Sequence, residues 1–152
     1  MVAVVLLPRD RAEFPALPSI PFDQPGDYDF KFRLPRSREV TVLLAVENFK
    51  VKGEPGRLLL TQLKTIIEVK LINHAGRIVC QVASVPGDGV GDDHWVLKSG
   101  GGEAAFWHRG CAEIKLKRSE SYTLKLRIRD VDPKTPKVRL TPMFERSDDY
   151  GP

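Results

Sequence analysis

Apolar and polar residues alternate along most of this chain with a period of two, which is typical of half-buried β-strands. The clearest example is residues 121–142, SYTLKLRIRDVDPKTPKVRLTP, where apolar and mostly basic positions alternate, a proline-rich turn intervenes, and the alternation resumes. The stretches DYDFKFRL and IIEVKLI alternate in the same way. Residues 40–46, VTVLLAV, are more continuously apolar and predict a more central strand.

Turn-forming residues separate these stretches. A proline–glycine pair precedes DYDFKFRL, and NHAG at residues 73–76 predicts a hairpin loop. On the strand that returns from this loop, Ile78, Cys80 and Val82 should point to one side. Residues 58–64 carry leucines at helical spacing, so this segment is the one place where a short helix fits the pattern.

The pattern predicts an all-β fold for a single domain over residues 1–152. About eight or nine short strands with turns between them indicate a two-sheet antiparallel β-sandwich, Ig-like or jelly-roll-like. At most one short helix is expected, near residues 58–64. A closed barrel is the alternative architecture. In either case the apolar side of each strand fills the core, and a slip of one residue would expose it.

Three segments depart from the alternation. Residues 8–26 are rich in proline and predict an extended lead-in along the domain surface. Its anchors should be four apolar side chains: Phe14, Leu17, Ile20 and Phe22. Residues 86–102 form a loop rich in glycine and aspartate, flexible by composition, and residues 147–152 form a polar tail. Ahead of the lead-in, the apolar run at residues 2–7 predicts an edge strand.

Composition narrows the classes of protein. With 41% hydrophobic and 29% charged residues the chain should fold, and a net charge of +4 is too modest and too interleaved with acids to indicate a nucleic-acid partner. No apolar run approaches the ~18 residues of a membrane span. The opening MVAVVLLPRD lacks a basic segment and a cleavage site, so it is not an intact signal peptide. It fits either the first strand of a mature exported chain or a cytosolic N-terminus.

Motifs for catalysis, metals and cofactors are weak. A loop cluster, Asp88, Asp92, Asp93 and His94, has the oxygen-rich character that calcium prefers, but neither EF-hand nor zinc spacing, and a solvated acidic loop is the favoured interpretation. There is no nucleophile elbow and no phosphate-binding loop. We therefore expect a non-enzymatic protein with no cofactor and no metal.

Two cysteines, Cys80 and Cys111, are too few for a disulfide scaffold. They would pair in an oxidising compartment and be buried thiols in a reducing one, and the residues leave this choice open. A catalytic role for Cys111 beside His108 has little support, because a cysteine three residues after a histidine is common by chance.

A run of outward cations follows the strands near the C-terminus. Lys125, Arg127 and Arg129 should face out on one strand. If the flanking strands are its neighbours, one sheet face carries seven cations, the others being Lys115, Lys117, Lys137 and Arg139. Like charges across strands are destabilising, so interleaved acids such as Asp29, Glu113, Glu120 and Glu145 are the favoured explanation. The alternative is a docking face for an acidic partner.

Two tryptophans flank the flexible loop. Trp95 and Trp107 are suited to closing the core, but tryptophan is also the commonest hot-spot residue of binding surfaces and a usual platform for sugars.

Three segments together resemble a family of small bacterial β-sandwich proteins of unassigned function: IPFDQPGDYDFKFRL, KLINHAGRIV and SYTLKLRIRDVDPKTPKVRLTP. The resemblance spans roughly residues 20–144 and rests on structural motifs of turn and alternation. Members are often exported lipoproteins, and some are encoded beside toxic effectors of contact-dependent systems such as type VI secretion. The lipoprotein signal and its lipidated cysteine are not found in this sequence.

The resemblance implies a periplasmic immunity-type protein that sterically blocks a cognate toxin, with a possible lipid anchor in a removed N-terminal segment; a cytoplasmic location is the alternative. A carbohydrate-binding sandwich that uses the tryptophans is the alternative function. The oligomeric state stays open. The expected partner-binding residues are Asp88, Asp92, Asp93, His94, Trp95, Trp107, His108, Lys125, Arg127, Arg129 and Arg139.

Overall fold

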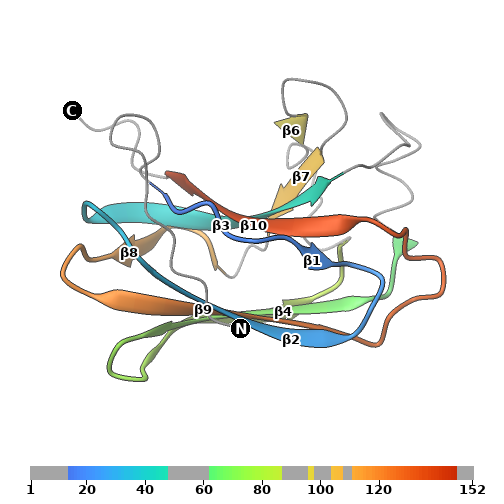
Figure 1. Cartoon of the computed structure of the whole chain (residues 1–152), viewed down its shortest axis with the longest axis horizontal. Helices are drawn as coiled ribbons and strands as arrows, with labels where there is room; N and C mark the ends of the chain where they lie inside the picture. The colour runs from blue at the N-terminus through green and yellow to red at the C-terminus, as the bar shows by residue number, and fades with distance from the viewer. Residues whose placement is uncertain (1–13, 48–61, 87–95, 98–103, 108–110, 147–152) are drawn as a thin grey trace.

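The computed structural model describes residues 14–47, 62–86, 96–97, 104–107 and 111–146 (Figure 1). The regular elements of these residues are β-strands, arranged in two antiparallel sheets that lie face to face, which confirms the predicted sandwich (Figure 1). The expected strand at residues 2–7 lies outside the described residues. So does most of the expected helix at residues 58–64, and residues 63–65 belong to no regular element.

Sheet A has the strand order β1-β10-β3-β7-β6, and β8 pairs with β3 beside β7. Its strands are β1 (Ile20–Pro21), β10 (Arg139–Arg146), β3 (Arg38–Glu47), β7 (Ala104–Trp107), β6 (Val96–Leu97) and β8 (Ile114–Leu116). Sheet B has the order β2-β9-β4-β5. Its strands are β2 (Gly26–Arg33), β9 (Ser121–Arg129), β4 (Ile66–Asn73) and β5 (Ile78–Ser84).

The core lies between the sheets and is filled by alternate residues of each strand, as the sequence period requires. From sheet B it receives Phe30, Phe32, Ile67, Val69, Leu71, Tyr122, Leu124, Leu126 and Ile128, and from sheet A Val40, Val42, Leu44, Val46, Leu140 and Phe144. The predicted inward face of β9 is confirmed, because Tyr122, Leu124 and Ile128 are all nearly inaccessible to solvent.

Tyr122 also closes the turn between β8 and β9. Its hydroxyl accepts a hydrogen bond from the Lys117 backbone N–H at 2.7 Å and donates one to Glu120 at 2.9 Å. Its ring stacks on Phe32 with centroids 5.7 Å apart. Burial, which disfavours the charged phenolate, raises the pKa of Tyr122. The side chain therefore remains a neutral structural link.

The described part of the proline-rich lead-in, residues 14–26, is anchored by the four apolar side chains that the sequence indicated. Leu17, Ile20 and Phe22 are buried. The Phe14 ring packs against the Phe144 ring, with their centroids 6.1 Å apart. The two residues of β1 pair with β10, and the Phe22 N–H donates to the Val138 carbonyl at 3.0 Å. Prolines are tolerated here because the lead-in contributes only a short edge strand.

The predicted hairpin between β4 and β5 is confirmed, with one correction to its returning strand. Asn73 Oδ1 accepts bonds from the N–H groups of Ala75 and Arg77, and Gly76 takes a φ of 80° that favours glycine. A bulge then shifts the register, because Leu71 faces Cys80 whereas Ile72 faces Ile78. The extra residue turns Ile78 outward, where it is 53% exposed, so the expectation that it points with Cys80 is wrong.

A disulfide joins the two sheets. Cys80 on β5 of sheet B is bonded to Cys111, which precedes β8 of sheet A, with Cα atoms 5.7 Å apart. Both residues are buried. The sequence left their pairing open, and the fold brings them together across the sandwich.

A polar cluster fixes the turn that leads from β9 to β10. Asp132 accepts hydrogen bonds from the backbone N–H groups of Lys134 (2.9 Å) and Lys64 (3.0 Å). Its own N–H donates to Thr65 Oγ1, which is 2.6 Å from Thr135 Oγ1. The bonds from Lys134 and then Lys64 stabilise the carboxylate and lower the pKa of Asp132.

We expect Asp132→Asn to lower the urea midpoint at pH 7, and this deficit to shrink in acid. A lowered folded pKa contributes stability that is complete above the unfolded value of about 3.9 and is lost as pH falls through the folded pKa. Urea titrations of both proteins at neutral pH and at about pH 3 measure the difference. Asp23→Asn serves as the control, because the Asp23 side chain accepts no hydrogen bond within the described residues. A deficit for Asp132→Asn that is the same at both pH values would contradict the assignment.

Candidate functional site

The cations of the predicted basic run do not share one face. β9 lies between β2 and β4 in sheet B, whereas β8 and β10 belong to sheet A. Lys125, Arg127 and Arg129 are therefore separated by the sandwich from Lys115 on β8 and Arg139 on β10. The expected seven-cation face is wrong, because outward positions of sequence-adjacent strands were assigned to the same sheet.

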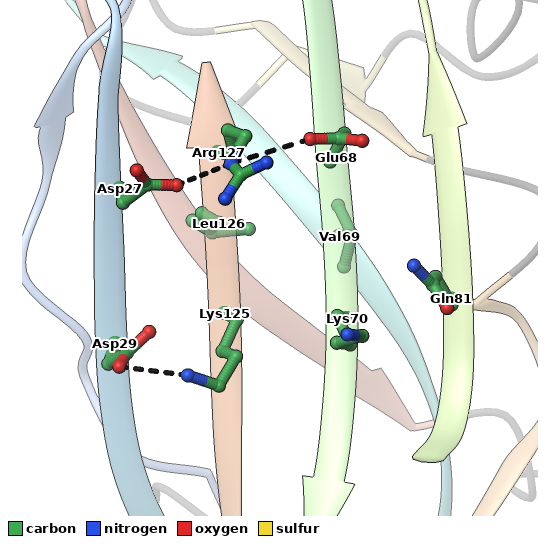
Figure 2. A pocket seen from close by; sticks show the side chains of 9 residues that line it. All are labelled: Asp27, Asp29, Glu68, Val69, Lys70, Gln81, Lys125, Leu126 and Arg127. Atoms are coloured by element: carbon green, nitrogen blue, oxygen red, sulfur yellow. Dashed lines mark hydrogen bonds and ion pairs between the residues drawn. The ribbon is translucent and has the colours of Figure 1, made fainter. Parts of the chain in front are cut away.

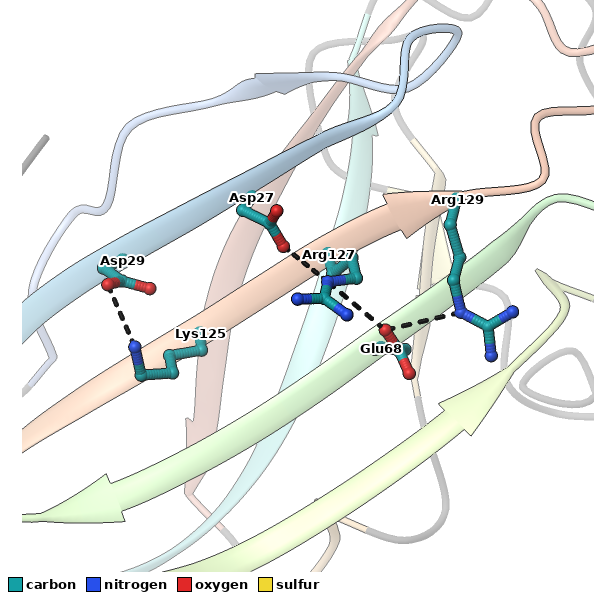
Figure 3. A network of polar contacts seen from close by, with 6 residues as sticks. All are labelled: Asp27, Asp29, Glu68, Lys125, Arg127 and Arg129. Carbon is teal, nitrogen blue, oxygen red and sulfur yellow. Dashed lines mark hydrogen bonds and ion pairs between the residues drawn. The ribbon is translucent and has the colours of Figure 1, made fainter. Parts of the chain in front are cut away.

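The outer face of sheet B instead carries an ordered mixture of acids and bases (Figure 3). Lys125 Nζ lies 3.0 Å from Asp29 Oδ2, and Arg127 Nε lies 2.5 Å from Asp27 Oδ1. These pairs follow from the register, in which Asp29 faces Lys125 and Asp27 faces Arg127 across β2 and β9. Interleaved acids are thus present and come mainly from β2, but of the four acids that the sequence indicated only Asp29 belongs to this network.

Glu68 on β4 completes this network. Its Oε2 lies 3.6 Å from Arg127 Nε and 3.4 Å from Arg129 Nε, and Arg129 also bonds Asp130 at 2.8 Å. The hydrogen bond that Arg127 donates to Asp27, followed by the charges of Asp27 and Glu68, raises the pKa of Arg127. Solvent screens each of these exposed pairs, so each contributes little to stability alone, and the network serves mainly to neutralise the arginines.

Lys70 lies beside this network but forms none of its ion pairs. It stands one outward position from Glu68 on β4, and the register places it between Lys125 of β9 and Gln81 of β5. Asp29 already pairs with Lys125, and Lys70 has no ion-pair partner among the described residues. A like-charged neighbour and an uncharged amide therefore flank an uncompensated ammonium group.

A pocket of about 270 Å³ lies on the outer face of sheet B, beside Lys125, Lys70 and Gln81 (Figure 2). Its lining residues are Asp27, Asp29, Glu68, Val69, Lys70, Gln81, Lys125, Leu126 and Arg127. None of these nine side chains is aromatic. The volume is below the roughly 300–1,000 Å³ of small-molecule sites, and suits a single side chain. A carboxylate in this pocket would meet the Lys70 ammonium and the Gln81 amide, both hydrogen-bond donors.

Two further predicted site residues, Arg139 and Trp107, belong to sheet A. Arg139 on β10 holds the lead-in, with Nε 2.6 Å from Ser19 Oγ and Nη2 2.9 Å from the Ser19 carbonyl oxygen. Trp107 ends β7 in sheet A, across the sandwich from the pocket. Six predicted residues lie outside the described residues: Asp88, Asp92, Asp93, His94, Trp95 and His108.

Four polar residues of the pocket were not among the predicted site residues: Asp27, Glu68, Lys70 and Gln81. Each occupies an outward position in an alternating stretch. The alternation predicts that the residue is exposed, but not which residue of a neighbouring strand lies beside it. The available signal was the acid–acid–base–base order of DYDFKFR facing the basic order of LKLRIR. Complementary outward charges are favourable in neighbouring strands, so this pair of segments could have been matched.

No protein-family model, no curated protein and no solved structure gives a significant match to this chain. Within the part of the chain that the structure describes, no helix has the length and apolar character needed to cross a membrane. Within the same residues, no three His, Cys, Asp or Glu side chains gather closely enough to hold a metal ion.

Proposed function

We propose that this chain is a non-catalytic protein-binding module whose pocket on the outer face of sheet B receives an acidic side chain of a protein partner. The observation that carries the proposal is the uncompensated Lys70 in a pocket of one-side-chain size. A partner carboxylate would neutralise Lys70 and relieve its repulsion with Lys125. The ion pairs around it are already satisfied, so binding would require little rearrangement of the face.

The compartment forms part of the proposal. A buried disulfide between Cys80 and Cys111 is characteristic of proteins that fold in oxidising surroundings, such as the bacterial periplasm. Together with the resemblance of the sequence to exported β-sandwich proteins, this favours a periplasmic immunity-type protein that covers a cognate toxin. A carbohydrate-binding module is less well supported, because the pocket lining contains no aromatic platform for a sugar ring.

Lys70→Glu should abolish partner binding without unfolding the chain. The experiment captures proteins from an extracytoplasmic extract of the native host on the wild-type chain, on Lys70→Glu and on Lys115→Glu. Lys115 is a matched control, since it is an exposed strand lysine on β8 of sheet A. A protein held by wild type and Lys115→Glu but not by Lys70→Glu is then purified for calorimetry.

For that protein we expect Lys70→Ala to weaken binding about 10–100-fold, because a hydrogen bond to a charged group contributes about 1.5–3 kcal/mol. High salt should lower the affinity of the wild-type chain until it approaches that of Lys70→Ala, because salt screens the charge of Lys70. Equal capture by the wild-type chain and Lys70→Glu would contradict the proposal. Saturable quenching of tryptophan fluorescence by oligosaccharides, with no captured protein, would favour the carbohydrate alternative.

A further inference from the structure

β2 is the terminal strand of sheet B, and its eight residues pair on one side with β9. Among the described residues no strand pairs with its other side. In an antiparallel pair alternate residues bond to the neighbour, and the residues between them direct their N–H and C=O groups away. A terminal strand of this length therefore offers a row of backbone donors and acceptors to another strand.

The outward side chains of β2 have an ordered charge sequence: two acids followed by two bases. They are Asp27, Asp29, Lys31 and Arg33. Asp27, Lys31 and Arg33 are exposed, and Asp29 is half-buried. The acids bond Arg127 and Lys125 on their β9 side, whereas Lys31 and Arg33 have no ion-pair partner within the described residues. The free edge thus presents two uncompensated cations beside two accessible carboxylates.

This order is complementary to itself in one antiparallel register. When two copies of β2 meet about Phe30, Asp27 faces Arg33 and Asp29 faces Lys31, so all four outward pairs are of opposite charge. A shift of two residues in one direction places Asp29 opposite Asp29, and in the other direction Lys31 opposite Lys31. A parallel, in-register pairing opposes like charges at every outward position. Cross-strand charge pairs favour the first register and disfavour the others.

We infer that the β2 edge is a homodimer interface, at which a second copy of this chain adds its β2 antiparallel about Phe30 and joins two copies of sheet B into one continuous sheet. The interface is isologous, because each copy contributes the same strand and the same four charges. This inference goes beyond the proposed function and does not depend on it, since Lys70 lies on β4 and takes no part in the edge.

Two charge-block variants test the register. Lys31→Glu/Arg33→Glu gives an all-acidic edge and leaves every ion pair of the network in place. Asp27→Lys/Asp29→Lys gives an all-basic edge. Each variant should repel its own copies, but the two together restore opposite charges at all four positions. The control Lys115→Glu/Lys117→Glu makes the same change of net charge on the β8 side of sheet A.

Sedimentation velocity over about 10 µM to 1 mM measures association of the folded proteins, whose integrity circular dichroism checks. We expect reversible dimers for wild type, the control and Lys70→Glu, monomers for each charge-block variant alone, and dimers again for their equimolar mixture. A wild-type chain that stays monomeric throughout would overturn the inference. So would dimers of the all-acidic variant as tight as wild type, or a mixture that remains monomeric.

Discussion

Replacing Leu126 with aspartate should leave the chain unfolded under conditions in which the native protein is folded. Leu126 is 1% exposed and points into the core from β9, between Tyr28 of β2 and Val69 of β4 in the register. The substitution loses the burial of a leucine, about 1.5–3 kcal/mol, and places a carboxylate without a partner in the core, at a further several kcal/mol. Together these costs are comparable with the whole stability of a typical domain, about 5–15 kcal/mol.

Far-UV circular dichroism and amide NMR dispersion measure this outcome. Thr123→Asp is the matched control, because Thr123 lies on the outward side of the same strand, opposite Lys31. The control should fold and unfold cooperatively like the native protein. If Leu126→Asp folds normally while Thr123→Asp does not, the assignment of the two faces of β9 is reversed.

Removing the disulfide should have the second largest effect. Replacing both Cys80 and Cys111 with alanine releases a cross-link that spans a sequence separation of 31 residues. The chain-entropy relation gives about 3–4 kcal/mol for a loop of this length. Alanine avoids introducing a buried hydroxyl group at either position, both of which are buried.

Urea titration of the oxidised protein, the reduced protein and the double variant measures the loss. The reduced protein and the variant should have similar midpoints, both well below that of the oxidised protein. Each single alanine variant should resemble the double variant, since one cysteine alone cannot form the bond. A titratable thiol in the untreated protein, or equal midpoints before and after reduction, would contradict the pairing.

The sequence predicted the strands well because burial depends on local period. The alternation of Tyr122, Leu124, Leu126 and Ile128 with outward polar residues holds in either sheet of a sandwich, so it identified the core face of β9 without knowledge of its neighbours. The predicted inward orientation of Ile78 was wrong for a local reason. The bulge adds one residue to β5, so Ile78, which precedes the bulge, lies on the opposite side from the one that strict alternation gives.

The order of the strands could not be predicted in the same way. Closing a long loop costs only slightly more entropy than closing a short one, so proximity in sequence does not decide which strands pair. β9 pairs with β2, about a hundred residues earlier, and not with β8, from which it is separated by a short turn. The expectation that β9 pairs with the strands next to it in sequence was therefore wrong. Its acidic partners come from β2 and β4.

The candidate site was unpredictable for a related reason. Lys70 is one of many lysines at outward positions, and what distinguishes it is that the register places it between Lys125 and Gln81 in the pocket, whereas Lys125 and Arg127 are paired with acids of β2. This combination of neighbours depends on how β9, β4 and β5 are aligned with one another. Lys125 and Arg127, which line the same pocket, could be predicted as outward cations from the alternation, but their pairing with Asp29 and Asp27 could not.

The pairing of early with late segments also constrains how the chain matures during synthesis. β1 and β2 bond to β10 and β9, with Asp27 and Arg127 one hundred positions apart. Neither sheet can therefore form completely until the last third of the polypeptide has been synthesised. Until then the apolar faces of β2, β3 and β4 lack the strands that cover them in the folded protein. Folds dominated by such long-range strand pairing form slowly. Because the bond between Cys80 and Cys111 joins the two sheets, we expect it to form after they have packed together.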